Sequence, residues 1–78
     1  MDYDTDKVDD AVLALLHLAS WEEHGISRAW KGHDWDALDR LHRRGLIASP
    51  RSKAKSVLLT EEGAVRARDL FQELFGIG

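Results

Sequence analysis

The chain has 78 residues, with 14 Asp or Glu, 11 Lys or Arg and a formal net charge of -3. This length predicts one domain over residues 1–78, which buries only about 60% of the surface that its unfolded form exposes. It contains no cysteine, which excludes disulfide bonds and thiolate metal sites. The acidic N-terminus and the lack of an apolar run of about 18 residues predict a soluble, cytoplasmic protein without a membrane span.

Charge is unevenly distributed along the chain. Residues 1–24 hold seven acids and one base, a balance of -6, whereas residues 25–56 hold eight bases and three acids, a balance of +5. The basic central segment predicts a surface that faces a polyanion. The alternative is that the opposite charges pair with one another within or between subunits.

The first helix is predicted to begin at Asp4 or Thr5, because either side chain can cap it, and to end at Gly25. Its apolar stripe has helical spacing and consists of Val8, Ala11, Val12, Leu15, Leu16 and Ala19. Residues 26–33 leave room for a helix of one or two turns, which Trp30 would anchor.

A third helix is predicted from the cap Asp34 to about Arg44, with Gly45 as its stop. The side chains expected to face inward are Trp35, Leu38, Leu41 and His42. On the outer face, two pairs at i,i+4 spacing are expected to interact, Asp36–Arg40 and Asp39–Arg43.

Two strands are predicted at residues 46–49 and 56–59, joined by a basic loop that contains the only proline. Thr60 is expected to cap the last helix, which Gly76 ends. The inner stripe of this helix is Ala67, Leu70, Phe71 and Leu74, with Phe75 beside it. The predicted fold class is therefore α+β, in the order α-α-α-β-β-α with a two-stranded hairpin.

The segment from Leu38 to Gly63 resembles winged-helix regulators of the MarR and PadR type. The matching residues are Leu38, Leu41, Gly45, Leu46 and Ile47, followed by Leu59, Thr60 and Gly63. The resemblance implies a winged helix-turn-helix fold, in which residues 46–59 form the wing, and a DNA-binding, regulator-like function. The whole chain also looks like a small bacterial family of uncharacterised function.

The leading hypothesis is a non-enzymatic module that binds double-stranded DNA, with the basic wing contacting phosphates. The expected contact residues are Arg51, Lys53, Lys55, Arg43, Arg44, Arg28 and Lys31. The presumed recognition helix, however, begins with Asp34, Asp36 and Asp39, which would repel phosphates. The alternative is therefore a winged-helix module that contacts another protein and does not bind nucleic acid.

Catalysis, cofactors and metals have little support in the sequence. It has neither a glycine-rich phosphate loop nor a nucleophile elbow, so no enzymatic activity and no cofactor are predicted. His17 and His24 are seven residues apart, about 10 Å of helical rise, and no His-x-x-x-His pair exists, so no metal site is predicted.

Aromatic and apolar residues suggest two contacts. The three tryptophans, Trp21, Trp30 and Trp35, are expected to build a core corner between helices, with an exposed protein-binding patch as the alternative. The last helix carries more apolar surface than a small domain covers easily, at Leu70, Phe71, Leu74 and Phe75. A homodimer through the first and last helices is therefore expected, as in the regulators that the chain resembles.

Overall fold

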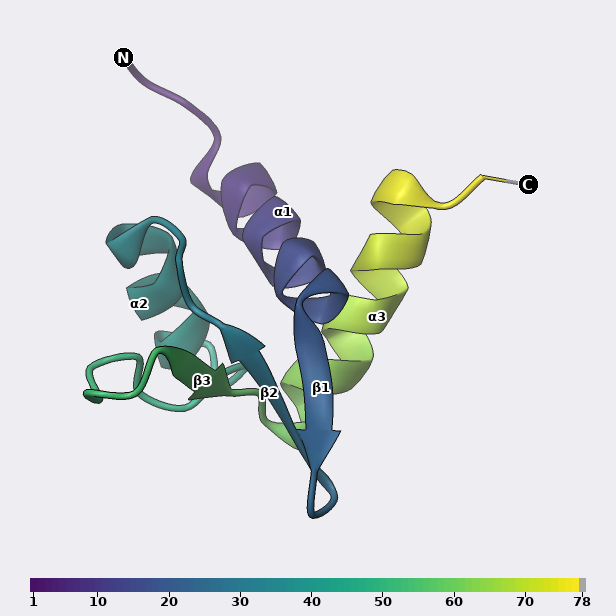
Figure 1. The fold of residues 1–78 in the computed structure, drawn as a ribbon. Coiled ribbons are helices and arrows are strands. Elements are labelled where there is room, and N and C mark those ends of the chain that lie inside the picture. Colours follow the sequence, from purple (N-terminus) through teal and green to yellow (C-terminus); the bar gives the residue numbers. More distant parts are fainter. Residues whose placement is uncertain (78) are drawn as a thin grey trace.

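The computed structural model describes residues 1–77 and contains helices and strands in the order α-β-β-α-β-α (Figure 1). The elements are α1 (Thr5–Leu18), β1 (Ser20–Glu23), β2 (Ile26–Trp30), α2 (Trp35–Arg43), β3 (Ser56–Leu58) and α3 (Glu61–Phe75). The strands form one antiparallel sheet in the order β1-β2-β3. The α+β class agrees with the prediction, but the predicted order α-α-α-β-β-α with a two-stranded wing is wrong.

The first helix begins as predicted but ends early. The Asp4 carboxylate accepts a hydrogen bond from the Lys7 N–H at 3.2 Å, which caps α1. The helix then stops at Leu18 instead of Gly25, because the chain turns into a β-hairpin. His24 and Gly25 have φ values of 54° and 77°, and two consecutive residues of positive φ make the turn that matches the twist of paired strands.

The hairpin also replaces the short helix predicted at residues 26–33. β2 lies at the centre of the sheet, where Ala29 pairs with Ser20 on one side and with Val57 on the other. Ala29 is fully buried and Val57 is 2% exposed, so this face of the sheet covers the core. The opposite face carries Trp21, Ile26, Arg28, Trp30 and Leu58.

The predicted caps of α2 are confirmed, but part of its inward face is not. Asp34 accepts a hydrogen bond from the Ala37 N–H at 3.1 Å, and Gly45 leaves the helix with φ of 76°. Leu38 and Leu41 are fully buried as predicted. Trp35 is 54% exposed, and His42 is also exposed, so the prediction that these two face inward is wrong.

The predicted wing is only partly present. β3 forms as expected, but the preceding strand is reduced to one bridge, Ile47–Leu59, and a hydrogen bond from the Ala48 N–H to the Leu58 carbonyl at 2.9 Å. β2 pairs with the other side of β3, and the buried Pro50 has no N–H with which to continue the ladder. A strand, β2, therefore precedes α2 where a helix-turn-helix would have a helix.

The end of α2 and the start of α3 meet at the main-chain oxygen of Leu46. The Thr60 hydroxyl caps α3, as predicted, by accepting from the Gly63 N–H at 3.0 Å. The Thr60 N–H donates to the Leu46 oxygen at 3.1 Å, and the Thr60 Oγ1 lies at the same distance from it. A Cβ atom added to Gly63 would lie 1.7 Å from that oxygen, so this position requires glycine.

A buried ion pair ties α1 to α2. Arg40 donates from Nε and Nη2 to the two carboxylate oxygens of Asp9, both at 2.7 Å. Asp9 is 1% exposed, and both of its oxygens are satisfied by the planar guanidinium. The predicted Asp36–Arg40 pair is thus replaced by a contact between helices, which the spacing within one helix cannot reveal.

Gly63→Ala is expected to destabilise the fold. Alanine normally stabilises a helix interior by about 1 kcal/mol relative to glycine. Here the added methyl group would overlap the Leu46 oxygen, and overpacking of this kind costs about 1–3 kcal/mol. Urea denaturation should show this loss, whereas Gly32→Ala, whose Cβ would meet open space, should change stability little. Equal stability of both variants would contradict the close approach.

Arg40→Met is expected to destabilise the protein because it leaves the Asp9 carboxylate buried without its cation. The matched change Arg44→Met, at an exposed position, should have a small effect. Adding Asp9→Leu to Arg40→Met should restore part of the lost stability, since the buried charge is then gone. Losses that simply add in the double variant would show that the two groups do not interact.

Candidate functional site

The structure divides the seven predicted basic contact residues among separate surfaces. Lys31, Lys53 and Lys55 line one groove. Arg28 lies on the outer face of the sheet, where its Nε donates to the Ser56 hydroxyl at 3.0 Å. Arg43 and Arg44 are exposed at the C-terminal end of α2.

The seventh residue, Arg51, is engaged with a carboxylate. Its Nη2 lies 2.9 Å from Asp39 Oδ2, and Arg43 points its Nε at the Asp39 main-chain oxygen instead, at 3.4 Å. The predicted Asp39–Arg43 ion pair is therefore replaced by Asp39–Arg51. This contact neutralises Asp39, one of the two acids within α2, and it connects the start of the basic loop to that helix.

The groove lies where the end of β2, the start of α2 and the loop of residues 50–55 meet, and we call it the Trp–Lys groove. Its volume is about 500 Å³. It is lined by Trp30, Lys31, Gly32, Trp35, Ser52, Lys53, Ala54 and Lys55. None of these lining residues carries a carboxylate, so the charged groups in the groove are all positive.

Lys31 links the loop of residues 50–55 to the strand end and to Trp35. Its ammonium group donates to the main-chain oxygens of Pro50 and Ser52 at 2.6 and 2.8 Å, and lies 3.4 Å from the Ser52 hydroxyl. Its main-chain N–H donates to the Lys55 oxygen at 3.1 Å. The ammonium also lies 5.9 Å from the centre of the Trp35 ring, within the range of a cation–π interaction. Lys31 thus positions the loop, while Lys53 and Lys55 take no part in the ion pairs found within residues 1–77.

The tryptophans of the groove are exposed. Trp30 and Trp35 are 56% and 54% exposed, so the expectation that they build a core corner is wrong for both. Trp30 also contacts Trp21 on the outer face of the sheet, with ring centres 5.0 Å apart. The sequence signal that points to this surface is the alternation of aromatic and basic residues in Trp21, Arg28, Trp30, Lys31 and Trp35.

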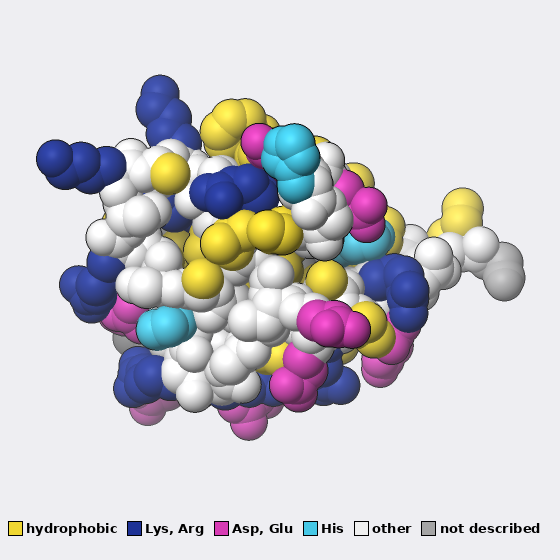
Figure 2. Space-filling view, turned by 90° about the horizontal axis from the view of Figure 1, so that it is seen from below, with side chains coloured by type: hydrophobic (Ala, Val, Ile, Leu, Met, Phe, Trp, Pro, Cys, Tyr) yellow, Lys and Arg dark blue, Asp and Glu magenta, His cyan; other side chains and the backbone are white. Residues whose placement is uncertain are grey.

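Figure 2 shows the molecule from below. Apolar side chains gather around a basic one on the upper part of the face. Further basic side chains project at the left, the side on which Figure 1 places the loop of residues 50–55. The basic and apolar side chains are therefore neighbours on one surface.

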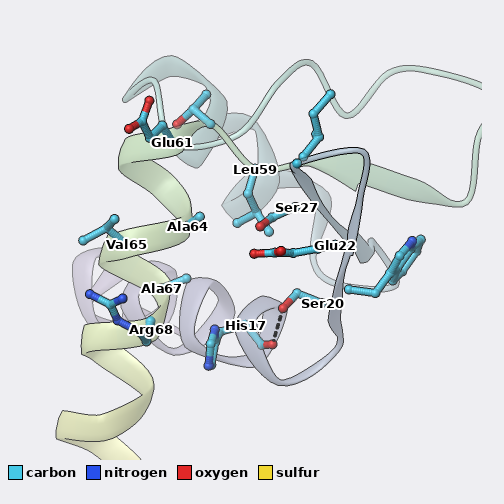
Figure 3. A pocket seen from close by; sticks show the side chains of 14 residues that line it. His17, Ser20, Glu22, Ser27, Leu59, Glu61, Ala64, Val65, Ala67 and Arg68 are labelled. Carbon is cyan, nitrogen blue, oxygen red and sulfur yellow. Dashed lines mark hydrogen bonds between the residues drawn. The ribbon is translucent and has the colours of Figure 1, made fainter.

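A second, larger groove of about 850 Å³ separates the β1–β2 hairpin from α3 (Figure 3). Glu22 projects into it from the hairpin, and Arg68 lies on the α3 wall. At its floor, the Ser20 hydroxyl donates to the main-chain oxygen of His17 at 2.6 Å instead of facing the imidazole. The groove combines charges of both signs, and one of its two serines, Ser20, is engaged at the end of α1.

Burial and hydrogen bonding change two pKa values. The hydrogen bonds that Arg40 donates to Asp9, aided by the negative charge of Asp9, raise the pKa of Arg40. Partial burial lowers the pKa of His33 below its ordinary value. His33 follows Gly32 of the Trp–Lys groove, and at neutral pH its imidazole adds little positive charge there.

The residues predicted for a protein interface differ in accessibility. Leu70 is 5% exposed and belongs to the core. Phe71 is partly buried between His17 and Phe75, with ring centres 5.5 and 5.4 Å away. Leu74 and Phe75 are each 47% exposed on the last turn of α3. Only the end of the predicted interface is therefore accessible to a partner.

Within residues 1–77, no group of three or more His, Asp or Glu side chains is placed to hold a metal ion. No helix in the same range is both long and apolar enough to cross a membrane.

Comparison with known proteins confirms that the chain is similar throughout to a small family of uncharacterised function, whereas the MarR and PadR resemblance is not confirmed. The uncharacterised protein y4hR of Sinorhizobium fredii is 55% identical over 75 residues, which cover 96% of this chain and 97% of that protein. No solved structure matches the chain. Residues 4–77 match the family described as a domain of unknown function (DUF6429), and the chain belongs to that family.

Proposed function

We propose that this protein is a non-enzymatic nucleic-acid-binding module, in which the loop of residues 50–55 contacts phosphates. The observation that carries the proposal is the Trp–Lys groove, where Lys53 and Lys55 stand exposed and no acidic side chain is present. Phosphate contacts by lysine supply affinity without reading the sequence of the bases.

The overall negative charge of the chain is compatible with this proposal because its acids lie outside the Trp–Lys groove, some of them in ion pairs. Asp9 is paired with Arg40, and Asp39 with Arg51. Other acids lie in the exposed N-terminal segment and the first turn of α1, and Figure 1 places the N-terminus at the top, away from the loop. A local basic surface can attract a polyanion when the net charge of the protein is negative.

The start of α2 argues against base reading by this helix. Asp34 is used as its cap, and Asp36 is exposed in its first turn. Carboxylates at this position repel phosphates and accept hydrogen bonds only from amino groups such as that of cytosine. Binding should therefore depend weakly on base sequence and strongly on salt.

The test is fluorescence anisotropy with a labelled mixed-sequence duplex and a single strand of the same length, at several salt concentrations. Lys53→Gln combined with Lys55→Gln should weaken binding and lower the log–log salt slope on the duplex by about 2, since each lost phosphate contact removes about 0.9. The control is Arg66→Gln, which removes an exposed charge on α3. Absence of salt-dependent binding to both probes at low salt would refute the function.

A second candidate function, contact with another protein, is favoured by exposed apolar side chains on α1 and α3. Leu18 is 66% exposed and Leu15 is 37% exposed, and Leu74 and Phe75 are half exposed. Figure 1 shows the ribbons of α1 and α3 diverging toward the C-terminal end of α3, where Leu74 and Phe75 lie. We propose a second copy of this chain as the partner, because a domain of this size buries a smaller fraction of its surface than a larger domain does.

Sedimentation velocity is the measurement for self-association. The wild type should form a dimer at high micromolar concentration, and Leu74→Ser with Phe75→Ser should shift it to a monomer. Val65→Ser is the matched control, because Val65 is also 47% exposed on α3 but lies near its start. A monomeric wild type at high micromolar concentration would refute the dimer.

A further inference from the structure

We infer that the Trp–Lys groove binds single-stranded nucleic acid, with bases stacking on Trp30 and Trp35 and phosphates contacting Lys53 and Lys55. This inference rests on the proposed function and names its substrate class. It starts from a juxtaposition that charge alone does not explain, because two half-exposed indole rings line the same groove as the lysines.

The two rings are exposed at rigid positions. Trp30 is the last residue of the central strand, and Trp35 is the first residue of α2 after its cap. Trp30 is supported from the side by Trp21, whose ring centre is 5.0 Å away, and Trp35 by the Lys31 ammonium at 5.9 Å. A platform that is ordered before binding loses little conformational entropy when a base stacks on it.

The indole rings favour single strands over duplexes. In a duplex the faces of the bases are covered by their neighbours, so an aromatic side chain can stack on a base only where the strand is unpaired. Stacking on aromatic rings is also tolerant of sequence, because every base has a π face. This agrees with a groove that offers few side-chain groups for reading base edges.

The composition of the groove favours a nucleic acid over a protein partner. Exposed tryptophan is enriched in protein interfaces, but lysine is depleted there. Three lysines and no carboxylate line this groove, and one of them, Lys31, is already held by main-chain oxygens of the loop. The two remaining ammonium groups are available to phosphates of a strand.

The test compares four probes on the full chain: fluorescein-labelled oligo(dT) of 12 nucleotides, a duplex of the same length, inorganic polyphosphate and vesicles of phosphatidylserine and phosphatidylcholine. We expect oligo(dT) to bind at least about tenfold more tightly than the duplex and to quench tryptophan fluorescence. Trp30→Leu and Trp35→Leu should each weaken oligo(dT) binding by about 5- to 150-fold, the effect of losing one stacked base. Neither change should alter binding of polyphosphate.

Two further variants separate stacking from folding. Trp35→Phe keeps an aromatic face and should retain more of the oligo(dT) affinity than Trp35→Leu. Tyr3→Leu removes another half-exposed aromatic ring, in the N-terminal segment outside the groove, and should leave binding unchanged. Circular dichroism of each variant identifies any that does not fold, and the Trp35→Phe comparison then decides the question.

Each remaining outcome has a distinct meaning. Equal affinity for duplex and oligo(dT), unaffected by the tryptophan changes, would overturn this inference and leave the proposed function standing. Absence of binding to both oligo(dT) and the duplex would overturn this inference and the proposed function. Binding to the vesicles alone, with a blue shift of tryptophan emission, would assign the groove to a membrane surface instead.

Discussion

The close approach of α3 to the main-chain oxygen of Leu46 determines how the second half of the chain is assembled. Gly63 leaves room for that oxygen, and Thr60 both caps α3 and donates its main-chain N–H to the same atom. The end of α2, the end of β3 and the start of α3 are thereby fixed at one point. The Asp9–Arg40 pair connects α2 to α1, and α1 packs on α3. Each helix is therefore joined to the other two.

The three helices leave one face of the sheet uncovered. The helices occupy the face that carries Ala29 and Val57, and the outer face keeps Trp30 more than half exposed. A buried aromatic side chain removes roughly 150–250 Å² from water, which is a large contribution in so small a domain. Because Trp30 and Trp35 are exposed, the fold lacks the stabilisation that burial of these rings would give. Their exposure therefore favours a binding role.

Features set by neighbouring residues could be predicted from the sequence. The caps at Asp4, Asp34 and Thr60 and the turn at Gly45 depend on side chains within a few positions, and all four are confirmed. The hairpin was missed because Gly25 ends a helix as readily as it makes a turn. Its formation depends on β2 pairing with β3, about 28 residues later in the chain.

The same distinction applies to the basic residues of the candidate site. Their positions in the sequence predicted a basic surface, but not which of them are already engaged. Arg51 is held by Asp39, twelve residues away, and Lys31 by the oxygens of Pro50 and Ser52, about twenty residues away. These partners come from other elements, so the charge pattern of the sequence cannot identify which basic side chains also hold the loop in place.

The engaged and the free lysines have complementary effects in the groove. Lys31 uses its N–H groups on the loop, yet its charge remains beside Trp35 and adds to the positive potential. Lys53 and Lys55 lie on that loop and can adjust to the spacing of phosphates, whereas Trp30 and Trp35 are fixed by a strand and a helix. Rigid rings next to adjustable charges suit a ligand whose bases are planar and whose backbone is flexible, which is the chemistry of an unpaired strand.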